Sequence, residues 1–158
     1  MPHDHPNVRA VTAALRAAGA TGEVVVLPDS APTAAAAAAQ LGCEVAAIAN
    51  SLVFDADGQP LLVLTSGAHR VDTTYLAAAL GLASLQRASP EFVRTHTGQP
   101  IGGVAPVGHP RPIRTVVDTW LGRHDTVWAA AGHPHTVFPT TFAELVALTD
   151  AEPAAVER

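Results

Sequence analysis

The sequence contains no lysine. All nine of its cationic side chains belong to arginine, 14 side chains are acidic, and the formal net charge is -5. A protein that binds nucleic acid over a broad surface is normally basic, so this composition excludes that class and predicts a small site for any nucleic-acid partner. Aromatic residues make up only 4% of the chain, which leaves few side chains on which bases can stack.

Cysteine is nearly absent as well. Cys43 is the only one, so an internal disulfide and a cysteine-based zinc site are both excluded, and we interpret Cys43 as a structural thiol. The apolar run at 31–41 is too short to cross a bilayer, and the polar N-terminus, with His3 and His5, lacks the pattern of a secretory signal. We therefore expect a cytoplasmic protein without a membrane or DNA partner.

The remaining composition is typical of a folded chain. With 158 residues, 48% of them hydrophobic and 15% charged, the chain is long enough to bury the core of one domain. We expect this domain to span residues 6–150, with short tails at 1–5 and 151–158.

Helices and strands alternate along the expected domain. Helical spacing and capping residues predict helices over 6–18, 34–41, about 72–80, from 89 onward, and 141–148. Short apolar or β-branched runs predict strands over 23–27, 45–54, 61–65, 82–87, 113–117 and 126–131, with a tight turn at 55–58. Residues 153–158 are expected to fray. The tight hairpin indicates a mixed α/β (α+β) fold rather than a purely parallel sheet.

A loop rich in glycine and proline covers residues 97–108. It includes Gly102, Gly103 and Pro106. Glycine lets a ligand approach the main chain closely and proline fixes the backbone, so the free amides of such a loop are suited to bind a carbonyl, hydroxyl or phosphate oxygen. The alternative is an ordinary turn between two elements.

Two histidines lie two residues apart, at 133 and 135. In extended chain such residues share a face, so His133 and His135 could supply two of the ligands of a metal site. A third ligand would have to come from His109, His124 or Asp118. The spacing alone is weak support, and we predict neither a metal nor another cofactor.

A further polar group lies at 69–72. Asp72 is placed to cap the helix that follows it. The functional alternative is that His69 and Asp72 form a pocket wall while Arg70 contacts a phosphate of RNA.

Several short motifs follow one another along the chain. They are the alanine-rich helix at 33–41, Ile48-Ala49-Asn50-Ser51-Leu52-Val53-Phe54, Gly67-Ala68-His69-Arg70-Val71-Asp72, Gly102-Gly103-Val104-Ala105-Pro106, and Ala129-Ala130-Ala131-Gly132 before the Phe142-Ala143-Glu144-Leu145 helix. Their order and spacing resemble the YbaK/EbsC-type family, the editing domains associated with prolyl-tRNA synthetase. The resemblance covers about residues 6–150.

This resemblance implies a single α/β domain built around a curved mixed sheet. It implies hydrolysis of a wrongly attached amino acid from tRNA, typically Ala or Cys on proline tRNA, with a hydroxyl of the terminal ribose helping to activate the attacking water. The tRNA acceptor end is the expected partner, and a prolyl-tRNA synthetase is a second candidate. Family members carry a Gly-x-x-x-Pro loop that lines the substrate pocket, here Gly102 to Pro106. The expected substrate contacts are Ser51, His69, Arg70, Asp72, Val104, Pro106, Gly132, His133 and His135.

One departure from the family concerns the strand motif. Most members carry a lysine at the position of Asn50, where it binds the end of the substrate, and this chain has no lysine to replace it. Asparagine keeps hydrogen-bonding groups but loses the charge, so Asn50 is suited to orient a carbonyl or a ribose hydroxyl and not to steady an anion. Because side chains alternate along a strand, we expect only one of Asn50 and Ser51, namely Asn50, to face the pocket.

Two hypotheses follow. In the first, the chain is a deacylase whose catalytic residues are Asn50, Gly102 and Gly103. In the second, it is a non-catalytic module that binds an aminoacyl-tRNA end or a small ligand.

Overall fold

Eight strands form one mixed sheet in the computed structural model, which describes residues 2–100 and 104–157. They lie in the order β1-β7-β6-β2-β3-β5-β8, and β4 pairs with β2. The strands are β1 (Val25–Val26), β2 (Ile48–Ala56), β3 (Gln59–Ser66), β4 (Leu85–Arg87), β5 (Arg114–Asp118), β6 (Val127–Ala130), β7 (Thr136–Thr140) and β8 (Glu152–Ala154). Parallel and antiparallel pairs both occur, which confirms the predicted mixed α/β fold.

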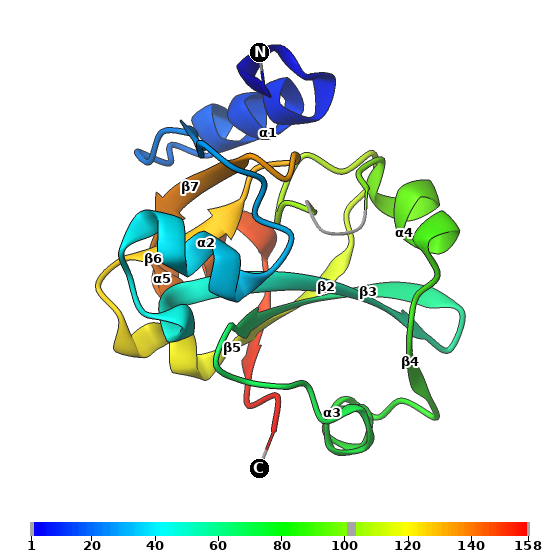
Figure 1. The fold of residues 1–158 in the computed structure, drawn as a ribbon. Coiled ribbons are helices and arrows are strands. Elements are labelled where there is room, and N and C mark those ends of the chain that lie inside the picture. Colours follow the sequence, from blue (N-terminus) through cyan, green and yellow to red (C-terminus); the bar gives the residue numbers. More distant parts are fainter. Residues whose placement is uncertain (1, 101–103, 158) are drawn as a thin grey trace.

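Five α-helices of the described residues surround this sheet (Figure 1). They are α1 (Pro6–Ala17), α2 (Ala34–Leu41), α3 (Thr73–Leu80), α4 (Pro90–Thr97) and α5 (Phe142–Thr149), and three short 3-10 helices are η1 (Pro2–Asp4), η2 (Val45–Ala47) and η3 (Thr119–Arg123). Asp72 accepts a hydrogen bond from the first turn of α3, which confirms the predicted cap, and Thr33 and Ser89 cap α2 and α4 in the same way.

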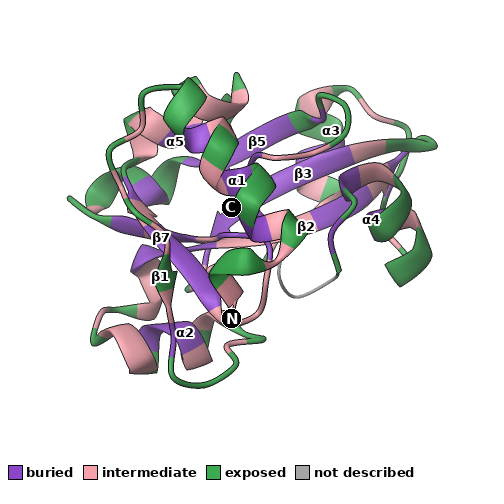
Figure 2. Cartoon of the chain, turned by 90° about the horizontal axis from the view of Figure 1, so that it is seen from above, coloured by how far each residue is buried: buried purple, intermediate pink, exposed green. Residues whose placement is uncertain are grey.

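The sheet separates two apolar cores. Helices α1 and α5 cover one face with side chains such as Val11 and Leu145, whereas α3 covers the other face with Leu76. Alternate residues of β2 enter the two cores, so that Val53 lies in the first and Phe54 in the second. Figure 2 shows the central strands buried and α1 exposed on its outer side. Helix α2 packs against a smaller apolar cluster where β2 and β6 meet.

The hairpin between β2 and β3 has a tighter turn than predicted. Strand β2 continues to Ala56, and only Asp57 and Gly58 turn the chain, both with positive φ. At the other end, the predicted strand 45–54 begins late, because residues 45–47 form η2.

The C-terminal part holds one strand that was not predicted and corrects one prediction. Residues 136–140 form strand β7, although proline, here Pro139, is rare inside strands. Strand β1 pairs only with Thr136 and Val137 of β7. That edge of β7 is therefore unpaired at Pro139, where the missing N–H is tolerated. The end of the chain is not frayed, because β8 pairs in parallel with β5 and Val156 is fully buried.

Candidate functional site

A pocket of about 50 Å³ opens between strands β2 and β6. The two strands pair in parallel only through Ile48–Ala49 and Trp128–Ala129. The pocket lies where β6 ends at Ala130 while β2 continues past Ala49. The N-terminal end of α2, which lies close to the start of β2 in Figure 1, forms another wall.

Small apolar side chains line most of this pocket. Six of the lining residues are alanines, namely Ala31, Ala34, Ala37, Ala49, Ala129 and Ala130. Alanine-rich walls and a small volume suit a ligand group of only a few atoms. The pocket therefore favours a small side chain over a large one.

Asn50 and Ser51 both line the pocket, although they face opposite sides of β2. Which of the two side chains faces the pocket stays a prediction. Beyond Ala49 the edge of β2 has no partner in β6, and β4 pairs with β2 only from Phe54 onward. A pocket that runs past an open strand edge is lined from both faces of the sheet.

The hydroxyl of Ser51 has an unusual environment. Its Oγ is buried and has no hydrogen-bond partner among the described residues. Burying a hydroxyl without a partner costs roughly 1–3 kcal/mol.

His133 is the only titratable residue among the described residues that line the pocket. Its Nδ1 accepts a hydrogen bond from the His135 backbone N–H at 3.0 Å, so the proton of the neutral ring lies on Nε2. Burial, with a smaller effect of His5 and then of His135, lowers the pKa of His133. At neutral pH His133 is therefore suited to donate a hydrogen bond rather than to act as a base.

The part of the glycine-rich loop that the structure describes is held firmly from inside. Gln99 is buried, its side-chain Oε1 accepts a hydrogen bond from the Ala105 N–H at 2.7 Å, and its Nε2 donates to the Val107 carbonyl at 3.4 Å. These bonds hold the backbone at Ala105 and Val107, next to Val104, which lines the pocket. The candidate residues Gly102 and Gly103 lie outside the described residues.

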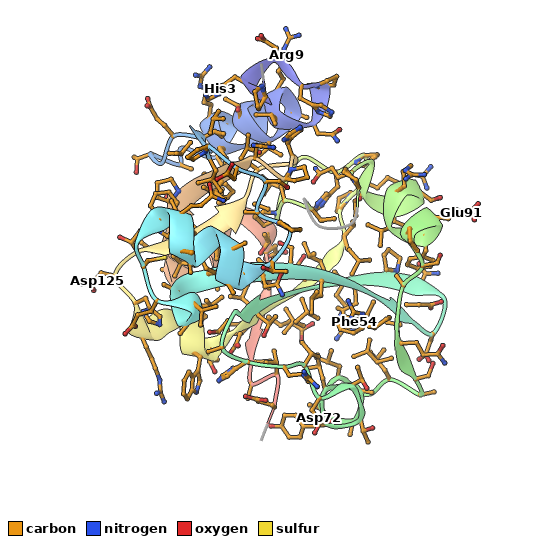
Figure 3. The ribbon with its side chains drawn as sticks, in the orientation of Figure 1. His3, Arg9, Phe54, Asp72, Glu91 and Asp125 are labelled. Atoms are coloured by element: carbon orange, nitrogen blue, oxygen red, sulfur yellow. The ribbon has the colours of Figure 1, made fainter. Side chains whose placement is uncertain are left out.

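Three predicted site residues, His69, Arg70 and Asp72, lie outside the pocket. His69 lies beside the buried Asp118, with 2.8 Å between His69 Nδ1 and Asp118 Oδ2, and its ring lies 4.3 Å from that of Trp120. Asp72 caps α3 by accepting a hydrogen bond from the Tyr75 N–H, which confirms the capping alternative. Figure 3 shows Asp72 at the start of α3, and Arg70 is exposed. None of the three lines the pocket that holds Asn50.

The remaining predicted site residues, Pro106, Gly132 and His135, have contacts outside the pocket. Pro106 lines a separate hollow between α1 and α5. Gly132 has a φ of 99° and packs against the backbone of Asn7, so a side chain there would be strained. His135 Nδ1 lies 3.3 Å from the Leu27 carbonyl oxygen. The pocket thus brings together Asn50, Ser51, Val104 and His133 out of the described candidates.

The histidines near the pocket do not complete a metal site. The ring centroids of His133 and His5 lie 5.3 Å apart, and those of His133 and His135 lie 5.5 Å apart. Within residues 2–100 and 104–157, no group of three or more His, Cys, Asp or Glu side chains is arranged to hold a metal ion.

Comparison with known proteins identifies the family. The model of the aminoacyl-tRNA editing domain matches residues 28–148, which is most of the chain. The chain belongs to this family. The match covers Asn50, Ser51, Val104 and His133, and so the whole described pocket of this editing domain.

Relatives of the editing domain include free-standing proteins and parts of larger ones. The uncharacterized protein YwhH of Bacillus subtilis is 31% identical over 124 residues, which is 78% of each chain. The proline–tRNA ligase of Levilactobacillus brevis is 34% identical over 92 residues, which is 58% of this chain but only 16% of the ligase. A solved structure described as a candidate trans-editing enzyme for prolyl tRNA synthetase is 41% identical, with a TM-score of 0.88 over 97% of this chain and 98% of that one.

The helices of this editing domain are all short. None of those in the described part of the chain is long and apolar enough to cross a membrane.

Three residues that line the pocket of the editing domain were not predicted as site residues. Thr33, Trp128 and Thr136 also line the pocket. The sequence indicates only a helix start at Thr33 and only a strand at Trp128. Thr136 lies in strand β7, which was not predicted.

Protonation of His109 is expected to weaken the folded editing domain. Burial lowers the pKa of His109 from its ordinary value of 6.5, and its Nε2 donates to the Ala105 carbonyl at 2.7 Å. The unfolded chain therefore takes up the proton more readily, so the free energy of unfolding falls as the pH drops below about 6.5. Glutamine keeps a donor but does not titrate. Denaturation in urea at several pH values should give a shallower loss for His109→Gln than for the wild type, and parallel curves would contradict this.

Proposed function

We propose that the chain hydrolyses the ester that joins a small, wrongly attached amino acid to the 3′ end of a tRNA, with proline tRNA as the expected carrier. The family assignment supports a hydrolase in general. The observation that carries the finer proposal is the small, alanine-lined pocket with Asn50 and Ser51 in its wall. The tRNA acceptor end is the proposed partner, a prolyl-tRNA synthetase is a second one, and the cytoplasm is the proposed location.

The described pocket also limits how water is activated. None of its described lining residues is a carboxylate, and His133 is placed as a donor. A base supplied by the protein is thus not apparent among these residues, which supports a role for a hydroxyl of the terminal ribose of the tRNA. Asn50 would orient the ester or that ribose, and the amides of Gly102 and Gly103 would stabilise the negative oxygen formed during attack.

Deacylation of proline tRNA charged with Ala, Ser or Cys tests the proposal directly. We expect the wild type to hydrolyse at least one of these esters, and Asn50→Ala to lower kcat/KM by about tenfold, which corresponds to one well-placed hydrogen bond. Asn50→Asp is the matched control, because it keeps the shape and removes the donor. If the folded wild type hydrolyses none of the three esters, the proposal fails and the non-catalytic binding module takes its place. The family assignment does not favour that alternative.

Restoring the family's residue separates the two hypotheses further. If the wild type is an enzyme, Asn50→Lys should change an activity that already exists. If Asn50→Lys creates activity where the wild type has none, then the natural protein does not use that chemistry. The same charged tRNAs and the same rate measurement serve for both variants.

A further inference from the structure

One buried residue in the wall of the pocket is not held by a helix or a strand. The other buried lining residues of the described chain belong to regular elements, namely Ala37 to α2, Ile48 and Ala49 to β2, Ala129 to β6, and Thr136 and Val137 to β7. Val104 is the exception, because it is 3% exposed and lies outside every helix and strand. Other contacts must therefore hold this part of the wall.

The buried side chain of Gln99 bonds to the backbone next to Val104. Its Oε1 accepts a hydrogen bond from the Ala105 N–H at 2.7 Å, and its Nε2 donates to the Val107 carbonyl at 3.4 Å. The Ala105 N–H belongs to the same planar peptide unit as the carbonyl and the Cα of Val104. The bond from Gln99 therefore orients the peptide unit that leads out of Val104.

A second side chain holds the next peptide unit. The carbonyl of Ala105 accepts a hydrogen bond from His109 Nε2 at 2.7 Å. Two successive peptide units are thus bonded to side chains, one through its N–H and the other through its C=O. The backbone on the C-terminal side of Val104 cannot turn without losing one of these bonds.

Gln99 is itself anchored to the end of α4. Its N–H donates to Thr97 Oγ1 at 3.0 Å, and this hydroxyl donates to the Val93 carbonyl at 2.7 Å, one turn earlier in the helix. Gln99 and Thr97 are each only 1% exposed. A buried polar network whose members are bonded to one another specifies a single geometry. The network therefore links a helix outside the pocket to the pocket wall at Val104.

We propose that Gln99 is a positioning residue that sets the size of the amino acid side chain the pocket accepts. Val104 belongs to the same apolar cluster as Ala49 and Ala129, which also line the pocket. The bond to the Ala105 N–H holds Val104 in this cluster and keeps the pocket narrow. Without that bond Val104 can withdraw, and the pocket gains room for a larger side chain. This inference rests on the proposed function and adds a residue that determines its selectivity.

The ratio of kcat/KM for the alanyl and the valyl ester of proline tRNA measures this selectivity. Valine has two more carbon atoms than alanine, so the wild type should prefer the alanyl ester. Gln99→Met keeps the length of the side chain and removes both hydrogen-bonding groups. We expect it to lower the preference by about tenfold, which is roughly the effect of one carbon atom in an apolar pocket.

Three further variants make this test specific. Gln99→Glu keeps an oxygen for the Ala105 N–H and should retain most of the preference. Gln99→Asn keeps the amide but shortens its reach by one carbon, so it should lower the preference as Gln99→Met does. Thr115→Val is the control, because it removes a buried hydroxyl that donates to the Ile113 carbonyl outside this pocket, and it should leave the preference unchanged.

A double substitution tests whether Gln99 acts through Val104. Val104→Ala shortens the wall directly and should also lower the preference by about tenfold. Independent effects would multiply when the two substitutions are combined. Because both changes act on the same part of the wall, Gln99→Met together with Val104→Ala should lower the preference no further than the stronger single substitution does.

The outcomes separate this inference from the function on which it rests. If Gln99→Met and Gln99→Asn slow both esters equally, if the two effects multiply, or if the wild type shows no preference, the inference fails while the deacylase stands. If the folded wild type hydrolyses neither the alanyl ester nor the seryl and cysteinyl ones, the proposed function itself fails, and the inference fails with it.

Discussion

Replacing Asp118 by alanine is expected to lower the free energy of unfolding by about 3–5 kcal/mol, which is a large part of the stability of a domain of this size. Asp118 ends strand β5 and is fully buried. Its Oδ2 accepts a hydrogen bond from the Ser66 N–H at 2.9 Å, and its Oδ1 accepts one from the Trp120 N–H at 3.0 Å. His69 Nδ1 lies 2.8 Å from the same carboxylate.

The size of this effect follows from what alanine would leave behind. Two backbone N–H groups and the ring nitrogen of His69 would lose their acceptor in a place that water reaches poorly. His69 also lies between Asp118 and Glu157, with its Nε2 3.5 Å from Glu157 Oε1, so the loss extends to the segment after β8. The carboxylate thus joins the ends of β3 and β5 to the C-terminal segment.

Chemical denaturation, followed by the fluorescence of Trp120 and Trp128, measures the change. Asp118→Asn keeps the shape but turns one acceptor into a donor, and it should cost less than Asp118→Ala. Asp125, which Figure 3 shows at the periphery of the molecule, is exposed, and Asp125→Ala should change the free energy of unfolding by less than about 0.5 kcal/mol. A loss below about 1 kcal/mol for Asp118→Ala would show that the carboxylate is not a structural centre.

The sequence was sufficient to predict those elements that depend on local chemistry. Asp72 caps its helix as expected, because a cap needs only a short polar side chain and the amides of the next turn. Strand β8 and the His69–Asp118 pair were not predictable in this way. Each depends on contacts between residues far apart in the chain, which local pattern does not encode.

The candidate site was predictable only in part for the same reason. The motif around Asn50 and the valine after the glycine pair led to the pocket. The open edge of β2 was not predictable from the sequence. It arises because β6 pairs with β2 only up to Ala49 and β4 pairs with β2 only from Phe54 onward. Alternation along one strand predicts the face on which a side chain lies, whereas the neighbours of that strand decide which residues the pocket contacts.

Filling the pocket from β6 is expected to have the largest effect on activity. Ala130 lines the pocket and is only partly buried, so a larger side chain there would project into the space proposed for the amino acid. Ala130→Leu adds three carbon atoms to a pocket of about 50 Å³. Each carbon that displaces the substrate costs roughly 1–3 kcal/mol, so we expect kcat/KM to fall by at least about 100-fold for alanyl, seryl and cysteinyl esters.

A matched substitution outside the pocket keeps this prediction specific. Ala79→Leu adds the same atoms to an exposed position of α3 and should leave the rates unchanged. Ala130→Val, a smaller addition, should weaken hydrolysis of the seryl and cysteinyl esters more than that of the alanyl ester, because the shortest side chain needs the least room. If a folded Ala130→Leu variant hydrolyses all three esters as fast as the wild type, the amino acid does not enter this pocket, and the site must be sought elsewhere on the domain.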